Sequence, residues 1–566
     1  MFPIIIIETF SKNYNQVDVI KEINNNYNFY FNKVNQSLDS IVYNNYKFKD
    51  QFKYQNINIW YANNLSERNI QKGNLINYLL ILEFLKNKIK KKIKIISVKT
   101  DSKVLMNSLK KLNIECFLIR SKFNFSIIKK NLFFVRTLSF LLKLIVKSIL
   151  IKNSKSLKFS LIKSNKIFFT PFESKKNINL ESLSKFNDKV EKLTNSKIIH
   201  IQYLSDINHK YKKIIPKKNK VNFNKENIFV IFELINFIEV LFCFFIYIKF
   251  YFISNKFLKD LSFFLKDKKK QYLFCAIHEE TMESFKGPIL LQNIFYIYIF
   301  NKIKRYSLSN SKIFFNFENQ YWEKILLQVF KNNTFCKYGV LDTPPKLWDS
   351  TLYLKNIKFN NKLFPNYILY SSPIYTKLVN SKNSFINKKL ILIESLRYKK
   401  NFSSKRNLNK NILVFGDGNK YSHKLLINKV KKLILNYKYS LHLREHPSCT
   451  NYSQGIKLSS NNLDIDLKKF SYFIVPNSSN SYLDIMLFNK IPFVFLSKES
   501  ISKSIFKIIN LNHLIFNNEN ELFTYINNLD KKNYKISINK IIENIILINN
   551  SFFLFEKFVK SHLKDV

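Results

Sequence analysis

Residues 412–418 read ILVFGDG, residues 440–447 read SLHLREHP, and residues 472–479 read YFIVPNSS. Each segment opens with an apolar, strand-like run and then turns polar. Helix-like stretches follow the first and third segments, at 422–436 and 482–489. This alternation predicts a Rossmann-like βα series whose polar residues lie at the carboxyl ends of parallel strands, where open α/β sheets bind ligands.

The chain ahead of this region also alternates between strand-like and helix-like runs. Its 566 residues are too many for one ordinary core, at roughly 150 residues per domain. We therefore predict an α/β protein with two Rossmann-like domains that face a cleft, and with apolar helices inserted in the N-terminal half. The expected strands ahead of residue 400 are Ile4–Ile7, Ile57–Tyr61, Ile93–Val98, Ile167–Thr170, Ile198–Gln202 and Ile313–Phe315.

The charge of the chain is extreme but has a compositional explanation. There are 93 basic and 39 acidic residues, a formal net charge of +54, yet only seven of the basic residues are arginine. Lysine has AT-rich codons, so an AT-biased genome that uses lysine as its default surface residue explains most of the charge. Proteins that read nucleic acid depend on the arginine fork, so we expect no nucleic-acid partner.

The five cysteines and the N-terminus bear on the compartment. The cysteines are scattered without a CxxC pair, which argues against a zinc ribbon and against a disulfide-stapled secreted domain. The opening residues MFPIIIIETF lack the basic start and the apolar length of a signal peptide. We therefore expect a cytoplasmic protein.

Two long apolar segments suggest contact with a membrane. Leu132–Ile151 places Arg136, Lys143 and Lys147 on one helical face, which is typical of an interfacial helix but also of a core-packed helix with a solvated stripe. Ile228–Ile253 is long enough to cross a bilayer, although charged residues interrupt it. A span, an in-plane segment and a buried core helix all remain open for it. We expect a location peripheral to the inner face of the cytoplasmic membrane.

Five segments resemble those of a known family, over about residues 270–500. The chain is similar to bacterial surface-carbohydrate (O-antigen and capsule) biosynthesis proteins with a glycosyltransferase-B-like (GT-B) half. These are distant relatives of bacterial sialyltransferases, Kdo transferases and glycerophosphotransferases. The segments are FENQYWE at 317–323, residues 340–349 ending in KLWD, ESLRY at 394–398, LREHP at 443–447, and the serine-rich residues 477–484. A histidine that the family has near residues 342 and 343 is missing here.

The resemblance implies a GT-B glycosyltransferase that needs no metal and no other cofactor. It would move a sugar from a nucleotide-activated donor to a glycan or lipid-linked acceptor of surface polysaccharide. A CDP-glycerol-type glycerophosphotransferase and a non-catalytic, membrane-associated assembly protein are the alternatives. The implied regions are an N-terminal α/β region at 1–130, its continuation with two apolar helices at 131–260, an acceptor-side interdomain region at 261–400, a nucleotide-sugar-binding domain at 411–530, and a C-terminal helix at 531–566.

The nucleotide is expected at the carboxyl ends of the C-terminal strands. Glycines allow a close backbone approach, proline stiffens a loop, and small hydroxyl residues before a helix favour a phosphate at its N-terminus. An ordinary turn and simple helix capping are the competing interpretations. The residues assigned to this site are Gly416, Gly418, Arg444, His446, Pro447, Ser478 and Ser479.

A general base is expected in the FENQYWE segment, because the acceptor hydroxyl must lose its proton as it attacks the anomeric carbon. Glu318 is the first candidate and Glu323 the second, with His278 as a fallback at a predicted strand end. The competing interpretation makes both glutamates structural. The supporting residues are Asn319, Gln320, Trp322, Asp484 and Arg397; the last would bind the diphosphate, join the two halves, or pair with Glu394.

Overall fold

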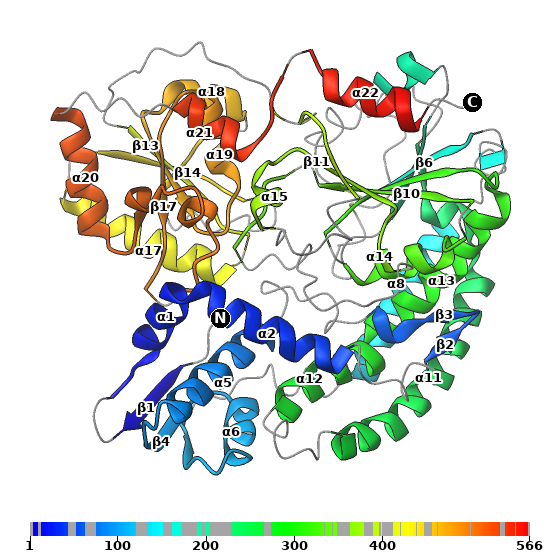
Figure 1. The fold of residues 1–566 in the computed structure, drawn as a ribbon, viewed down its shortest axis with the longest axis horizontal. Helices are drawn as coiled ribbons and strands as arrows, with labels where there is room; N and C mark the ends of the chain where they lie inside the picture. Colours follow the sequence, from blue (N-terminus) through cyan, green and yellow to red (C-terminus); the bar gives the residue numbers. More distant parts are fainter. Residues whose placement is uncertain are drawn as a thin grey trace.

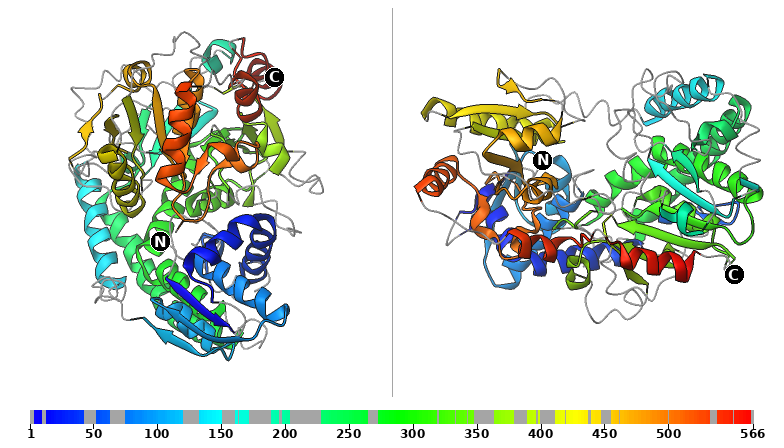
Figure 2. Two further views of the ribbon diagram at one scale, coloured as in Figure 1. Left: turned by 90° about the vertical axis from the view of Figure 1, so that its left-hand side faces the viewer. Right: turned by 90° about the horizontal axis from the view of Figure 1, so that it is seen from above.

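The protein is an α/β molecule with two large parallel sheets (Figure 1). The computed structural model describes residues 4–9, 13–42, 52–62, 75–119, 133–150, 161–162, 164–171, 189–194, 198–203, 228–264, 273–318, 320–332, 334–341, 343–347, 363–378, 389–395, 398, 411–418, 420–436, 439–446, 455–460, 462–498, 500–531, 538–549 and 551–563. The sheets of seven and six strands lie on opposite sides of the molecule in Figure 1 and in the right-hand view of Figure 2, and a small N-terminal sheet lies beside them.

The six-stranded sheet is parallel throughout, in the order β15-β14-β13-β16-β17-β18. Numbered within the domain this order is 3-2-1-4-5-6, the doubly wound arrangement of Rossmann folds. Its strands are β13 (Asn411–Phe415), β14 (Ser440–Arg444), β15 (Lys457–Leu458), β16 (Tyr472–Pro476), β17 (Pro492–Phe495) and β18 (Ile515–Phe516), and its helices are α17 (Lys420–Asn436), α18 (Leu463–Lys469), α19 (Ser481–Leu487), α20 (Glu519–Lys531) and α21 (Ile538–Ile545).

The seven-stranded sheet follows the same rule. It is also parallel throughout, in the order β12-β11-β10-β9-β6-β7-β8, so its own strands run 3-2-1-4-5-6-7. The winding direction reverses between β6 and β9 here, and between β13 and β16 in the other sheet. The strands are β6 (Lys166–Pro171), β7 (Ile199–Tyr203), β8 (Ile228–Val230), β9 (Lys312–Asn316), β10 (Cys336–Leu341), β11 (Tyr367–Tyr370) and β12 (Leu390–Leu392).

Helices cover both faces of the seven-stranded sheet, as a parallel sheet with two apolar faces requires. Ile313 and Phe315 of β9 belong to the large core cluster that includes helices of the N-terminal half. Phe314 points to the opposite face, where Tyr338 stacks on it at 4.9 Å and the ring of Phe558 meets Tyr338 edge-on at 5.6 Å. The helices of this half are α8 (Phe133–Leu150), α11 (Phe237–Phe264), α12 (Phe274–Lys286), α13 (Pro288–Tyr306), α14 (Tyr321–Val329) and α15 (Ile374–Leu378).

Phe558 belongs to α22 (Phe553–His562), the last described helix, which lies over the seven-stranded sheet (Figure 1). The chain therefore leaves the six-stranded domain and returns to the first one. Leu547 bonds this returning segment to the first domain. Its N–H donates to the Ser371 carbonyl at 2.7 Å, and its carbonyl accepts from the Ser395 N–H at 2.8 Å. The buried Glu394 carboxylate then accepts the first N–H groups of α22, from Leu554 at 2.9 Å and Phe555 at 2.8 Å.

The N-terminal region forms a third, smaller unit. In its sheet β1 runs antiparallel to β4, and β4 is parallel to β5. Asn24 joins this unit to the six-stranded domain, because its side chain donates to the Ser500 carbonyl at 3.4 Å and accepts from the Ser502 N–H at 2.9 Å. The elements are β1 (Ile5–Thr9), α1 (Gln16–Asn25), α2 (Tyr27–Val42), β2 (Lys53–Tyr54), β3 (Ile57–Asn58), α5 (Leu75–Lys90), β4 (Ile95–Thr100), α6 (Lys103–Lys110) and β5 (Cys116–Leu118).

Three predictions from the sequence are wrong in detail. The apolar segment Ile228–Ile253 is not one helix, because β8 and the 3-10 turn Ile231–Leu234 use its first residues and α11 begins at Phe237. Ile57–Tyr61 is a two-residue strand followed by a 3-10 turn. His278 lies within α12 rather than at a strand end.

We predict that Glu394→Ala loosens α22 from the seven-stranded sheet. The substitution leaves one buried and one partly buried N–H group without their charged acceptor, which should cost about 1–3 kcal/mol of the free energy of unfolding. Urea unfolding measures the loss, and limited proteolysis should show earlier cleavage near residue 550. Glu556→Ala, in the first turn of the same helix, is the control and should change little. Equal stability of both variants would contradict the prediction.

Candidate functional site

Gly416 allows the loops after β13 and β14 to meet. Its N–H donates to the Arg444 carbonyl at 2.8 Å, which extends the pairing of the two strands. A Cβ at this position would lie 2.8 Å from the His446 backbone nitrogen and 2.9 Å from the ring of the buried His423. Any larger residue would therefore push these two loops apart. Gly418 follows as the exposed end of the same turn.

Asp417 connects the loops on the two sides of the switch point of the six-stranded sheet. The Ser478 hydroxyl, after β16, donates to its carboxylate at 2.9 Å. The Asp417 backbone N–H donates to Nδ1 of His423 in α17 at 3.2 Å. His446, after β14, lies within electrostatic reach of the same carboxylate. Gly416, His446 and Ser478 thus converge around Asp417, which lies at the position where doubly wound sheets hold ligands.

The seven-stranded domain reaches the same place through the loop after β10. The Leu347 N–H donates to the Lys503 carbonyl at 3.0 Å, so the two domains touch here through their backbones. Asn477 fixes the other side of this contact, because its side-chain oxygen accepts from the Lys503 N–H at 2.8 Å and the Ser504 N–H at 3.1 Å. The carboxyl ends of the two parallel sheets therefore meet at Lys346, Leu347 and Lys503.

The electrostatics of this contact favour an anion. Partial burial lowers the pKa of Lys503, and the nearby Lys346 lowers it further, whereas Asp417 opposes the shift. Loss of hydration also lowers the pKa of His446, again with Asp417 opposing and with Lys346 and His423 adding to the shift. Lys346 and Lys503 thus lie near one carboxylate, with His446 beside them, and an added anion would relieve the repulsion between the two lysines. We refer to Asp417, His446, Lys346 and Lys503 as the junction cluster.

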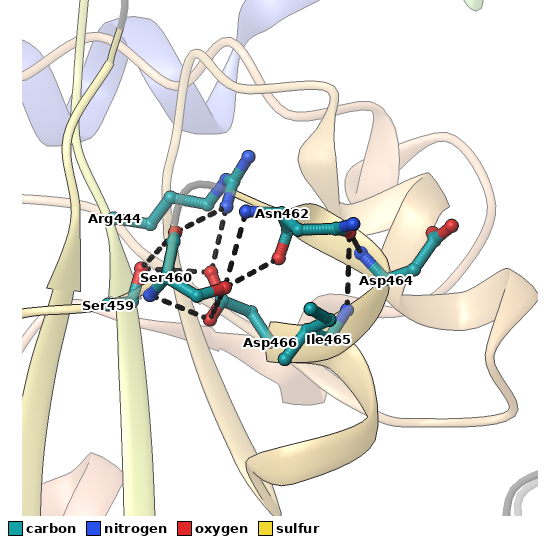
Figure 3. Close-up of polar contacts among 7 residues, drawn as sticks. All are labelled: Arg444, Ser459, Ser460, Asn462, Asp464, Ile465 and Asp466. Carbon is teal, nitrogen blue, oxygen red and sulfur yellow. Dashed lines mark hydrogen bonds and ion pairs between the residues drawn. The ribbon is translucent and has the colours of Figure 1, made fainter.

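Arg444 has a buried partner within its own domain (Figure 3). Its Nη1 donates to the Asp466 carboxylate at 2.7 Å and to the Ser460 carbonyl at 3.2 Å. Asp466 is fully buried and also accepts from the Ser459 hydroxyl at 2.9 Å and from both the N–H and the hydroxyl of Ser460. The arginine therefore neutralises a buried carboxylate, and a contact of Arg444 with nucleotide stays a prediction.

The serine-rich loop binds chiefly to itself and to Asp417. The Ser479 hydroxyl donates to the Ser481 hydroxyl at 3.0 Å, and accepts from the Ser481 N–H at 3.1 Å. Asp484 lies in the first turn of α19. This helix has seven residues, and its N-cap residue Asn480 makes no capping bond through its side chain. We therefore assign no phosphate site to its N-terminus.

Glu318 lies at the carboxyl end of β9, beside the switch point of the seven-stranded sheet. Its side chain is exposed, and the Gln320 amide donates to its carboxylate at 2.6 Å. The Trp322 indole N–H in turn donates to the Gln320 side-chain oxygen at 2.9 Å. A buried tryptophan thus fixes the glutamine that orients an exposed carboxylate. Strand β9 pairs directly with β10, whose following loop carries Lys346.

Glu323 is fully buried, and its carboxylate bonds the backbone of the Glu318 loop instead of facing solvent. Its Oε1 accepts the Glu318 N–H at 2.9 Å, whereas no described group bonds its buried Oε2. Burial raises the pKa of Glu323 to about 8, with the charge of Glu318 adding to the shift and Lys324 opposing it. A carboxyl without solvent contact cannot reach an acceptor hydroxyl in this conformation. Glu323 therefore positions the Glu318 loop, and its role as the second base candidate is not supported by this geometry.

Several predicted site residues lie outside the described part of the chain: Asn319, Arg397 and Pro447. Sequence reasoning missed Lys346, Lys503 and Asn477, and it treated Asp417 only as part of a turn. A signal existed for Asp417 and Asn477, which follow predicted strands directly. The residue type of the two lysines gave no signal, because lysine dominates the whole chain, although Lys346 lies in the KLWD segment that carries the family resemblance. Among the described residues, no group of three or more His, Cys, Asp or Glu is arranged to hold a metal ion.

Comparison with known proteins adds little. No protein-family model matches this chain, and no curated protein matches its sequence. Among solved structures, S. aureus MnaA in a co-structure with UDP is similar at 10% identity and a TM-score of 0.36, over 70% of this chain and 97% of the other. A similarity at this level does not establish a shared fold or function. The family resemblance of the five sequence segments stays a prediction.

We predict that Glu323→Gln removes a pH dependence of stability. Between its ordinary pKa and about pH 8, the folded chain keeps a proton on Glu323 that the unfolded chain has released. Wild-type stability therefore falls as the pH rises through this window, by at most about 1.4 kcal/mol per pH unit. The Tm of the variant should exceed that of wild type at pH 8, and the difference should shrink toward pH 5.

The control is Glu115→Gln, at an exposed glutamate in the N-terminal unit. It should leave the pH dependence of Tm unchanged. A Tm difference between Glu323→Gln and wild type that stays constant from pH 5 to pH 8 would show that Glu323 is ionised in the folded chain.

Proposed function

We propose that this protein is a metal-independent glycosyltransferase of the GT-B type. It transfers a sugar from a nucleotide-activated donor to a hydroxyl group of a glycan or a lipid-linked acceptor in surface-polysaccharide synthesis. The observation that carries the proposal is the junction cluster, where the carboxyl ends of two doubly wound sheets meet. Two parallel, doubly wound sheets whose carboxyl ends lie at the domain contact support this proposal.

The junction cluster suits the diphosphate of a nucleotide sugar. Lys346 and Lys503 supply positive charge from the two domains, and His446 supplies a ring nitrogen that loss of hydration keeps uncharged at neutral pH. A diphosphate gains negative charge when the glycosidic bond to its sugar breaks. Lysines fixed at that position would stabilise the leaving group in the transition state more than in the bound donor.

Glu318 is the general base that deprotonates the acceptor hydroxyl. Its carboxylate takes the proton from the acceptor hydroxyl while that oxygen forms a bond to the anomeric carbon, and the nucleoside diphosphate departs with the electron pair of the broken bond. Gln320 and Trp322 orient the carboxylate by hydrogen bonds. Glu323 holds the backbone of the same loop.

The donor site is tested with a panel of nucleotides. We predict that at least one of UDP, GDP, CDP and CMP raises the Tm of the full chain. Lys346→Met and Lys503→Met should each weaken its Kd roughly 10-fold to 100-fold, because each removes a charged contact to phosphate. Lys468→Met, at an exposed lysine of α18, is the matched control and should bind like wild type.

Lys503→Met carries a second, opposite expectation. Because its pKa is lowered in the folded chain, a charged Lys503 costs stability at neutral pH, and this cost disappears as the pH rises above the ordinary lysine value. The unliganded variant should therefore melt at a higher temperature than wild type at pH 7. Absence of any nucleotide binding would favour the non-catalytic assembly role, and binding of CDP and CMP alone would favour a cytidine-activated donor.

The base is tested by Glu318→Gln. With water in place of the acceptor, the release of nucleoside diphosphate from the donor that the panel selects should slow roughly 10²-fold to 10⁴-fold. Donor Kd should change less than twofold, because the residue does not contact the junction cluster in this assignment. Gln320→Leu should slow release by a smaller factor. Full turnover in Glu318→Gln would place the base elsewhere.

A further inference from the structure

The outer surface of α8 and α11 is apolar, in contrast to the usual surface of a water-soluble helix. On α8 most exposed side chains are hydrophobic, and on α11 Phe242, Phe245 and Phe252 are exposed along one side of the helix. We refer to this surface as the α8–α11 face. Its exposed large hydrophobic residues are Phe134, Val135, Leu138, Leu142, Val146, Ile149, Leu150, Phe237, Ile238, Phe242, Phe245 and Phe252.

The polar side of α8 faces the protein, which is the reverse of the sequence-based expectation. Lys147 is buried, and burial lowers its pKa to about 8. Lys143 is half-buried, and Arg136 is tied to Glu283 of α12 by two hydrogen bonds, of 2.9 Å and 2.7 Å. Facing water, a helix would gain stability from the opposite orientation. The observed orientation fits a helix that lies against an apolar medium.

α11 cannot cross a bilayer, because the side opposite its exposed phenylalanines is part of the protein core. Its buried residues recur at helical spacing, on the side opposite the exposed phenylalanines: Val240, Cys243, Tyr247, Phe250 and Ser254. The Tyr247 hydroxyl donates to the Lys286 carbonyl at 2.8 Å, and the Ser254 hydroxyl to that of Phe285 at 2.9 Å. Residues Phe237–Lys256 are long and apolar enough to span a bilayer, but this packing allows only an in-plane arrangement.

The charge of the face identifies its occupant. Among the described side chains of α8 and α11, the exposed charged ones are basic: Arg136, Lys249 and Lys256. Lys249 and Lys256 follow Phe242 and Phe245 along the same stripe of α11. Glu239, whose side chain is the one acidic side chain described on these helices, is half-buried and paired with Lys302. Two copies of this chain, each with a formal net charge of +54, would bring like charges together at such a contact.

We propose that the α8–α11 face binds in the plane of an anionic lipid bilayer. The phenylalanine and leucine side chains enter the boundary between headgroups and acyl chains, and the lysines extend to the lipid phosphates. This proposal does not depend on the proposed glycosyl transfer. The α8–α11 face lies on the side of these helices that points away from the seven-stranded sheet. The proposal also accounts for the inward orientation of Lys143 and Lys147 of α8.

The test is co-sedimentation of the full chain with vesicles of phosphatidylcholine alone or with about 30% phosphatidylglycerol. Wild type should partition at least about tenfold more strongly onto the anionic vesicles, and less so at high salt. The triple substitution Leu142→Ser, Phe245→Ser, Phe252→Ser should lower that partition at least about tenfold. The matched control, Leu458→Ser, Ile465→Ser, Phe553→Ser, removes side chains of similar exposure elsewhere and should bind like wild type.

A second variant separates charge from apolar contact. Lys249→Glu combined with Lys256→Glu should abolish the preference for anionic vesicles and leave the Tm of the protein unchanged. The proposal is overturned if wild type binds neither vesicle, or if the triple-serine variant binds as well as the control. It is also overturned if light scattering shows a wild-type dimer that the triple-serine variant converts to a monomer, since the face would then join two copies.

Discussion

The hydrogen bond from the Leu347 N–H to the Lys503 carbonyl fixes the relation between the two large domains at the place where chemistry is expected. All strands of each large sheet run in one direction, so each sheet presents all its carboxyl ends at one edge. This backbone contact brings the loop that follows β10 against the loops of the six-stranded sheet, whose own carboxyl ends already share one edge. Without this contact, the charge of Lys346 would not lower the pKa of His446 and Lys503. The junction cluster would then lose the positive charge that the first domain supplies.

The sequence predicted the C-terminal domain well, for a physical reason. The segments at 412–418, 440–447 and 472–479 contain strands β13, β14 and β16, as expected. β13 and β16 were recognisable because strands buried on both faces appear as unbroken apolar runs between polar turns. The supporting roles of Gln320 and Trp322 were also predictable, since both polar groups lie within a few residues of Glu318. The segment Ile228–Ile253 was not, because a buried strand and a buried helix have the same apolar composition.

Charge was the least predictable property. The burial of Glu323 and Lys147 depends on neighbours that are distant in sequence, so no local pattern reveals it. Composition hid the rest. In this chain lysine also fills buried positions where it bonds backbone carbonyls. Lys337 donates to the Phe330 carbonyl at 3.0 Å, and Lys490 donates to the Phe470 carbonyl at 2.6 Å. Where lysine stabilises the core, covers the surface and lines the domain contact, its abundance carries no information about function.

The return of α22 to the first large sheet also has a consequence for the order of folding. Phe168, Phe314 and Tyr338 belong to strands that leave the ribosome early, but the helix that covers them is synthesised hundreds of residues later. Until then one aromatic face of the sheet stays in contact with water or with a chaperone. A nascent chain that stops after the six-stranded domain would therefore expose a flat aromatic surface, the kind of surface that drives aggregation.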